Sequence, residues 1–62
     1  MTQQEMREKV RFWHEYYYTP YSKIAANAGL TPNFLTLFAK GERNLGEENK
    51  ERLEILLINK NL

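Results

Sequence analysis

Two Thr-Pro pairs, which lie twelve residues apart at Thr19-Pro20 and Thr31-Pro32, constrain the fold of this sequence more than any other feature. Threonine is a favoured N-cap residue, and proline is tolerated at the first helical position, where its missing N–H would be unpaired anyway. Each pair therefore predicts the start of a short helix. Because glycine adopts a left-handed turn at least cost, we expect these two helices to end just before Gly29 and Gly41.

A helix is also expected on the N-terminal side of these two. Thr2 and Glu5 have the Thr-x-x-Glu spacing of a capping box. An apolar stripe with helical spacing follows and predicts a buried face for a helix that ends near Tyr18; it consists of Met6, Val10, Trp13 and Tyr17.

A fourth helix is predicted after Leu45-Gly46 and should reach about Asn59. Its first turn is acidic, as the helix dipole favours, and its main apolar stripe is Leu53, Leu56 and Leu57. Residues 1–62 then form one all-α domain, since 62 residues are enough for a single small core. Cysteine is absent, so helix packing must supply the stability.

Several functional classes are disfavoured by composition. The longest aliphatic run, residues 55–58, is far shorter than the roughly 20 residues of a membrane span. Because the sequence also shows no apolar signal segment, we expect a cytoplasmic protein. The chain has no Asp, no Cys and one His, which removes the usual triads and metal clusters. We expect no enzyme activity, cofactor, metal or small-molecule substrate.

A helical projection of residues 32–40 separates an apolar side from a polar side. The apolar side holds Phe34, Leu35 and Phe38, and the other holds Asn33, Thr36, Leu37 and Lys40. The preceding helix has a small apolar face with two alanines, which allow close approach of the helix backbones; this face is Tyr21, Ile24, Ala25 and Ala28. Residues 19–43, which are also mildly basic, are therefore predicted to form a helix-turn-helix unit.

Residues 21–43, YSKIAANAGLTPNFLTLFAKGER, resemble the helix-turn-helix of the phage repressor and Cro-like (Xre) family. The residues at the signature positions of that family are Ala25, Gly29, Leu30, Leu35 and Phe38. The segment GERNLGEENKERLEILL also resembles the Gly-x-Arg turn and following helix of the family, so the resemblance covers about two thirds of the chain. It implies a four-helix, lambda-repressor-like domain that binds double-stranded DNA sequence-specifically, as a repressor-type regulator or as part of a larger one.

The resemblance also implies a role for individual residues. Base reading would fall to Asn33, Thr36 and Leu37. The Asn33 amide suits adenine, the Thr36 hydroxyl suits a hydrogen-bond donor or acceptor, and the Leu37 side chain suits the thymine methyl group. Phosphate binding would fall to residues near the two helix ends, namely Tyr21, Ser22, Thr31, Lys40 and Arg43. The sequence departs from the family pattern at Tyr21, where glutamine is frequent, and at Pro32, where a polar side chain is frequent.

Two apolar groups leave alternatives open. Ile55 and Ile58 lie opposite Leu53 and Leu57, so they either form the patch of a homodimer or pack against the first helix. A cluster of aromatic residues is expected to pack in the core; it consists of Phe12, Trp13, Tyr16, Tyr17 and Tyr18. Two of them, Phe12 and Tyr16, point about 100° away from the main stripe and are available to a neighbouring helix or a partner. The alternative function is therefore a protein-interaction or inhibitor module that uses this aromatic face. His14 is expected to be half-exposed and without a role.

Overall fold

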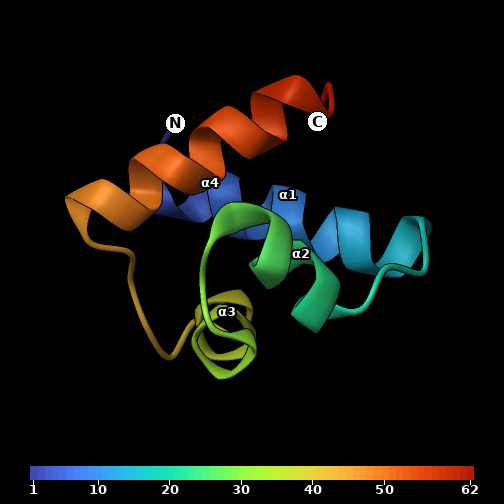
Figure 1. Ribbon diagram of the computed structural model, residues 1–62, viewed down its shortest axis with the longest axis horizontal. Helices are drawn as coiled ribbons and strands as arrows, with labels where there is room; N and C mark the ends of the chain where they lie inside the picture. The colour runs from blue at the N-terminus through green and yellow to red at the C-terminus, as the bar shows by residue number, and fades with distance from the viewer.

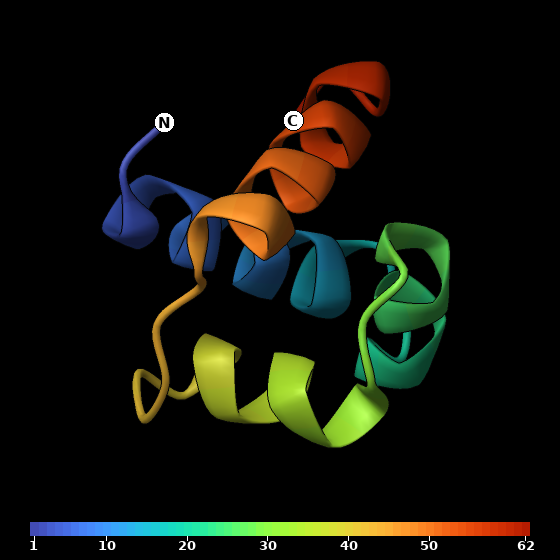
Figure 2. The same cartoon turned by 60° about the vertical axis from the view of Figure 1, so that its left-hand side comes forward.

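The computed structural model describes residues Met1–Leu62, which form four α-helices and no strands (Figure 1). The helices are α1 (Gln3–Tyr16), α2 (Tyr21–Ala28), α3 (Pro32–Ala39) and α4 (Glu47–Asn59). Helix α2 packs mainly on α3, while α1 contacts both α3 and α4. In Figures 1 and 2, α3 forms the lower edge of the molecule, α4 the upper edge, and α1 lies between them. None of the four helices is long and apolar enough to cross a membrane.

The core contains twelve buried side chains, all of them apolar. Helix α1 contributes Met6, Val10 and Trp13, which confirms most of the predicted stripe. The remaining members are Ile24, Ala25, Ala28, Leu35, Phe38, Ala39, Leu45, Leu53 and Leu57. Since no polar side chain is buried, non-directional apolar burial holds the four helices together.

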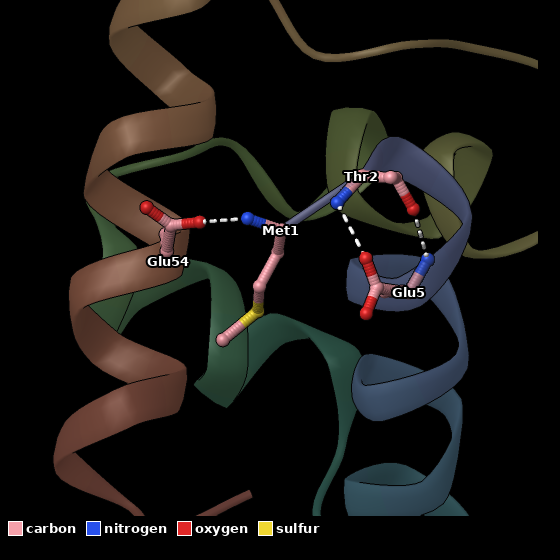
Figure 3. Close-up of polar contacts among 4 residues, drawn as sticks. All are labelled: Met1, Thr2, Glu5 and Glu54. Carbon is pink, nitrogen blue, oxygen red and sulfur yellow. Dashed lines mark hydrogen bonds and ion pairs between the residues drawn. The ribbon is translucent and has the colours of Figure 1, made fainter.

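The predicted capping box is present at the start of α1 (Figure 3). The Glu5 backbone N–H donates to Thr2 Oγ1 at 3.1 Å, and the Thr2 backbone N–H donates to Glu5 Oε1 at 3.0 Å. The hydrogen bond that the Thr2 backbone N–H donates to the Glu5 carboxylate stabilises its ionised form and is the main reason that the pKa of Glu5 is lowered. Beside them, the amino group of Met1 forms an ion pair with Glu54, which ties this end of α1 to α4.

Three of the other predicted boundaries are also confirmed. Thr31 caps α3, accepting a hydrogen bond from the Phe34 N–H at 3.3 Å, and Pro32 is the first helical residue. Helix α2 ends at Ala28, and its C-cap Gly29 has a left-handed φ of +73°. Helix α4 has the predicted bounds. Helix α3 ends at Ala39, one residue earlier than expected, and Gly41 then turns with a φ of +85°.

The predicted start of α2 at Thr19-Pro20 is wrong by one residue. Pro20 is the N-cap and Tyr21 the first helical residue, and no side chain caps this helix. The Thr19 hydroxyl instead donates to the Tyr17 carbonyl at 3.5 Å. The Thr19 carbonyl lies 2.7 Å from His14 Nδ1, so a contact to α1 fixes the conformation in which Thr19 cannot cap.

The prediction that the aromatic cluster packs in the core is wrong for all members except Trp13. Helix α1 ends at Tyr16 rather than near Tyr18, because Tyr18 adopts a left-handed φ of +55°. The exposed members are Phe12, Tyr16, Tyr17 and Tyr18. Three of them contact each other: the Phe12 and Tyr16 rings stack with centroids 5.0 Å apart, and the Tyr17 ring lies edge-on to both. Phe12 and Tyr16 lie outside the one stripe of α1 that faces the core, and Tyr17, the last predicted member of that stripe, lies beyond the end of the helix.

Candidate nucleic-acid interface

Helices α2 and α3 pack on each other, and the small side chains that the sequence indicated are buried on α2. Ile24, Ala25 and Ala28 are buried on α2, and Leu35 and Phe38 are buried on α3. Alanine at a helix crossing leaves little between the two backbones and lets them approach closely. After the left-handed turn at residue 29, the next backbone N–H donates to the Ala25 carbonyl at 2.9 Å, which closes the end of α2.

The predicted base-reading residues lie together on the side of α3 that the core does not use. Asn33 is exposed, and Thr36 and Leu37 are half-buried. Their spacing of three and four residues places them on one helix face, opposite Leu35 and Ala39, which are buried. Because Leu35, Phe38 and Ala39 are buried on the other side of α3, this face is turned away from the core, and α3 itself forms the lower edge of the molecule (Figure 2).

Thr36 has its hydroxyl group already in use. Its Oγ1 donates to the Pro32 carbonyl, one turn earlier in α3, at a distance of 2.9 Å. This is the common back-bonding geometry of threonine within a helix. The hydroxyl hydrogen is therefore engaged, and Thr36 offers an outside partner only an oxygen lone pair and its methyl group.

The N-terminus of α2 lies on the same lower side of the molecule as α3 in Figures 1 and 2. The first backbone N–H groups of a helix have no intrahelical partner, and in α2 no side chain caps them. Tyr21 and Ser22 occupy the first two positions of this helix; Tyr21 is half-buried and Ser22 is exposed. Burial raises the pKa of the Tyr21 hydroxyl, with smaller effects from Arg11, which lowers it, and Glu15, which raises it. Tyr21 thus stays protonated and can donate a hydrogen bond.

His14 positions this end of α2, a role that the sequence did not indicate. Its ring stacks on the Tyr21 ring at a centroid distance of 3.9 Å, while Nδ1 lies 2.7 Å from the Thr19 carbonyl oxygen. A carbonyl oxygen only accepts, so Nδ1 carries the hydrogen and donates. One side chain of α1 therefore fixes both the loop before α2 and its first aromatic residue.

Lys40 and Arg43 follow the last residue of α3, and both are exposed. Neither takes part in the two ion pairs of the structure, which join Met1 with Glu54 and Arg52 with Glu48. Their charges are therefore not compensated within the molecule by direct pairing. The structure places Thr31, the remaining predicted phosphate residue, at the opposite end of α3 as its cap.

Arg7 holds the segment that carries these two cations, and the sequence analysis missed it. Its Nε donates to the Phe38 carbonyl at 2.7 Å, and its Nη2 donates to the Arg43 carbonyl at 3.2 Å and to Asn44 Oδ1 at 3.0 Å. The guanidinium also lies over the Phe38 ring, 4.8 Å from the centroid. A cation is thus placed at the C-terminal end of α3, where the helix dipole favours it.

Gln3 fixes the end of the same segment. Its side-chain amide donates to the Leu45 carbonyl at 2.9 Å and accepts from the Leu45 N–H at 2.9 Å, so that both backbone groups of one buried residue are paired. Side chains from the first two turns of α1 therefore bind the loop between α3 and α4 at both ends. These partners are 31 to 42 residues apart in the chain, so no local pattern reveals them.

Ile55 and Ile58, the predicted dimer patch, do not pack against α1. They are 54% and 57% exposed, on the side of α4 opposite the buried Leu53 and Leu57. The sequence left both arrangements open, and the structure excludes the one in which they are covered by the chain itself.

Comparison of the chain with models of known protein families, with curated proteins and with solved structures finds no match. The functional interpretation therefore rests on the sequence pattern and on the geometry described above.

Proposed function

We propose that this protein binds double-stranded DNA sequence-specifically, with α2 and α3 as a helix-turn-helix and α3 in the major groove. The observation that carries the proposal is the face of α3 opposite its buried side, where Asn33 is exposed, Thr36 and Leu37 are half-buried, and none of the three belongs to the core. The major groove of B-DNA is wide enough to admit an α-helix. A helix that packs on one side and projects on the other has the geometry for this insertion.

The distribution of charge supports the same orientation. The unpaired Lys40 and Arg43 follow α3, and the uncapped N-terminus of α2 presents backbone N–H groups on the same side of the molecule. Both are suitable partners for phosphate oxygens. The acidic side chains Glu47, Glu48 and Glu51 lie in the first half of α4, at the opposite edge. Because Lys50 and Arg52 offset two of these three charges, and Arg52 pairs directly with Glu48, α4 is only weakly acidic, and the unpaired cations of this surface lie beside α3.

In this proposal the protein acts on cytoplasmic DNA as a transcriptional regulator of the repressor type. A homodimer would give it two recognition helices for a two-fold symmetric site. Ile55 and Ile58 are the proposed centre of the dimer interface, because they are exposed large aliphatic side chains on the outer face of α4.

The test is a salt titration of duplex binding with single-charge variants. Lys40→Ala and Arg43→Ala should each weaken binding to specific and random duplexes alike, and each should reduce the slope of log K against log salt by about one unit. Lys50→Ala, which removes the same charge from α4, is the matched control and should leave the slope unchanged. Equal slopes for all three variants would contradict the proposed phosphate contacts, and the absence of duplex binding at low salt would contradict the function.

A second candidate function is protein binding through the aromatic face of α1. It is favoured by the stacked and exposed Phe12 and Tyr16 rings, together with a surface groove of about 710 Å³ that Phe12, Tyr17 and Leu62 help to line. Binding of this kind should depend weakly on salt, because apolar contacts dominate it. Phe12→Ser should abolish partner binding and leave duplex affinity unchanged, whereas Lys40→Ala should do the reverse.

A further inference from the structure

The outward face of α3 is unusually poor in hydrogen-bonding groups for a surface that reads bases. Pro32 and Leu37 have side chains without a polar atom, and the hydroxyl hydrogen of Thr36 is engaged by the Pro32 carbonyl at 2.9 Å. Only Asn33 retains a complete donor and acceptor pair in its side-chain amide. In the first two turns of α3 the face therefore offers one amide surrounded by methyl and methylene groups, and its one cation, Lys40, comes after the last helical residue.

This set of groups matches one kind of base pair. In the major groove, adenine presents an acceptor and a donor side by side, which a single carboxamide satisfies, and thymine presents a 5-methyl group beside its O4 acceptor. Guanine presents two acceptors, which require two donors such as those of an arginine, and cytosine presents an amino group that needs an acceptor. Among the residues in the first two turns of α3, no cationic side chain is available for guanine.

We propose that the α3 face selects A·T base pairs, with Asn33 on adenine and with the side chains of Leu37 and Thr36 packed on thymine 5-methyl groups. This inference rests on the proposed DNA-binding function and specifies its target: duplexes whose central contacts are adenine and thymine. The role of Thr36 differs from the one that its residue type suggests, because the methyl group rather than the hydroxyl group makes the contact.

The contact to a thymine methyl group can be isolated chemically. Uracil has the same hydrogen-bonding edge as thymine and lacks only the methyl group, so replacing thymine with uracil removes apolar contact and nothing else from the major groove. Burial of one methyl or methylene group corresponds to about a fourfold change in affinity. Uracil at a contacted position should therefore weaken binding about fourfold, and at two positions more than tenfold.

Two conservative variants separate the contribution of the Thr36 methyl group from that of its hydroxyl group. Thr36→Val keeps a methyl group at the same place and removes the hydroxyl group, so its affinity for the thymine duplex should remain within about twofold of the wild type. Thr36→Ser keeps the hydroxyl group and removes the methyl group, so it should bind about fourfold more weakly and lose the sensitivity to uracil at its contacted position. Binding by Leu37→Ala should become insensitive to uracil at a different position of the duplex, the one that Leu37 contacts. Circular dichroism of each variant checks that the helices are retained.

The experiment starts from a random duplex pool, from which the sites bound best are selected and sequenced, and ends with titrations of the selected site and its uracil-substituted form. We expect the selected sites to be rich in A·T base pairs and to lose affinity when uracil replaces thymine. We also expect Thr36→Val to keep the affinity of the wild type and Thr36→Ser to lose part of it. Selected sites centred on guanine, with the preference lost in Lys40→Ala, would show that the lysine reads bases and would overturn the inference while leaving DNA binding intact. The same conclusion follows if uracil has no effect. Failure to bind any duplex would instead overturn the proposed function, and the inference with it.

Discussion

Replacing Arg7 with methionine tests whether α1 organises the segment that carries the proposed phosphate contacts. Methionine keeps an unbranched side chain that can still cover the Phe38 ring, but it removes four hydrogen bonds: three to Phe38, Arg43 and Asn44, and one to Gln4 within α1. The change therefore removes the guanidinium group with little change in apolar packing. The expected result is a less stable fold and a less ordered loop between α3 and α4.

The magnitude follows from the three bonds that join α1 to this segment, because the exposed bond to Gln4 lies within α1 and contributes little. The bond to the Phe38 carbonyl is short, 2.7 Å, and partly buried, and a charge-assisted bond of this kind contributes about 1–2 kcal/mol. The two exposed bonds contribute about 0.5 kcal/mol each, because water competes for both partners. Together they amount to about 2–3 kcal/mol, which lowers the melting temperature of a domain of this size by about 10–20 °C.

The assay is chemical and thermal denaturation followed by circular dichroism, with Arg11→Met as the matched control. Arg11 lies on the same helix, is exposed and takes part in neither ion pair, so its replacement should change stability by less than about 0.5 kcal/mol. Arg7→Lys should behave like Arg7→Met, because an ammonium group cannot reproduce the fork of donors. Equal stability of the Arg7→Met and Arg11→Met proteins would refute the assigned role of Arg7.

The sequence predicted the helices well where local chemistry decides their ends. Thr2 and Glu5 form the expected capping box, Thr31 caps α3 as its position before proline indicated, and Gly29 takes the left-handed turn. In each case the groups that satisfy the helix end are at most five residues away in the chain, so the pattern contains the necessary information. The same holds for the outward face of α3, which follows from helical periodicity alone.

Where a contact joins distant segments, the sequence pattern was insufficient. Thr19 has the same local context as Thr31, yet it does not cap its helix, because the His14 side chain of α1 binds its carbonyl group. Arg7 and Gln3 similarly acquire their partners only when α1 packs beside the loop after α3. Each of these contacts pairs a polar side chain with a backbone group, and almost any polar residue in the same region of sequence would look equivalent before folding.

The remaining predictions concern assembly and the two glycines at helix ends. Replacing both Ile55 and Ile58 with glutamate should keep the helical circular dichroism and shift sedimentation from dimer to monomer, with duplex affinity falling in step; a monomeric wild type at tens of micromolar would contradict the proposed interface. Gly29→Ala and Gly46→Ser should change stability in opposite directions. At Gly29, φ is +73° and an added Cβ would lie 3.8 Å from Arg52 Nη1, so space is sufficient and the backbone conformation alone should cost about 1–2 kcal/mol. Gly46 is the N-cap of α4, with a φ of −74°, and no side chain caps this helix. No atom lies within 4 Å of an added Cβ, so there is space for a serine side chain. The serine hydroxyl can accept hydrogen bonds from the free N–H groups and should stabilise the fold by a few tenths of a kcal/mol. Urea denaturation of the two variants measures both changes, and a destabilised Gly46→Ser protein or an unchanged Gly29→Ala protein would show that the backbone at these helix ends differs from the conformation described.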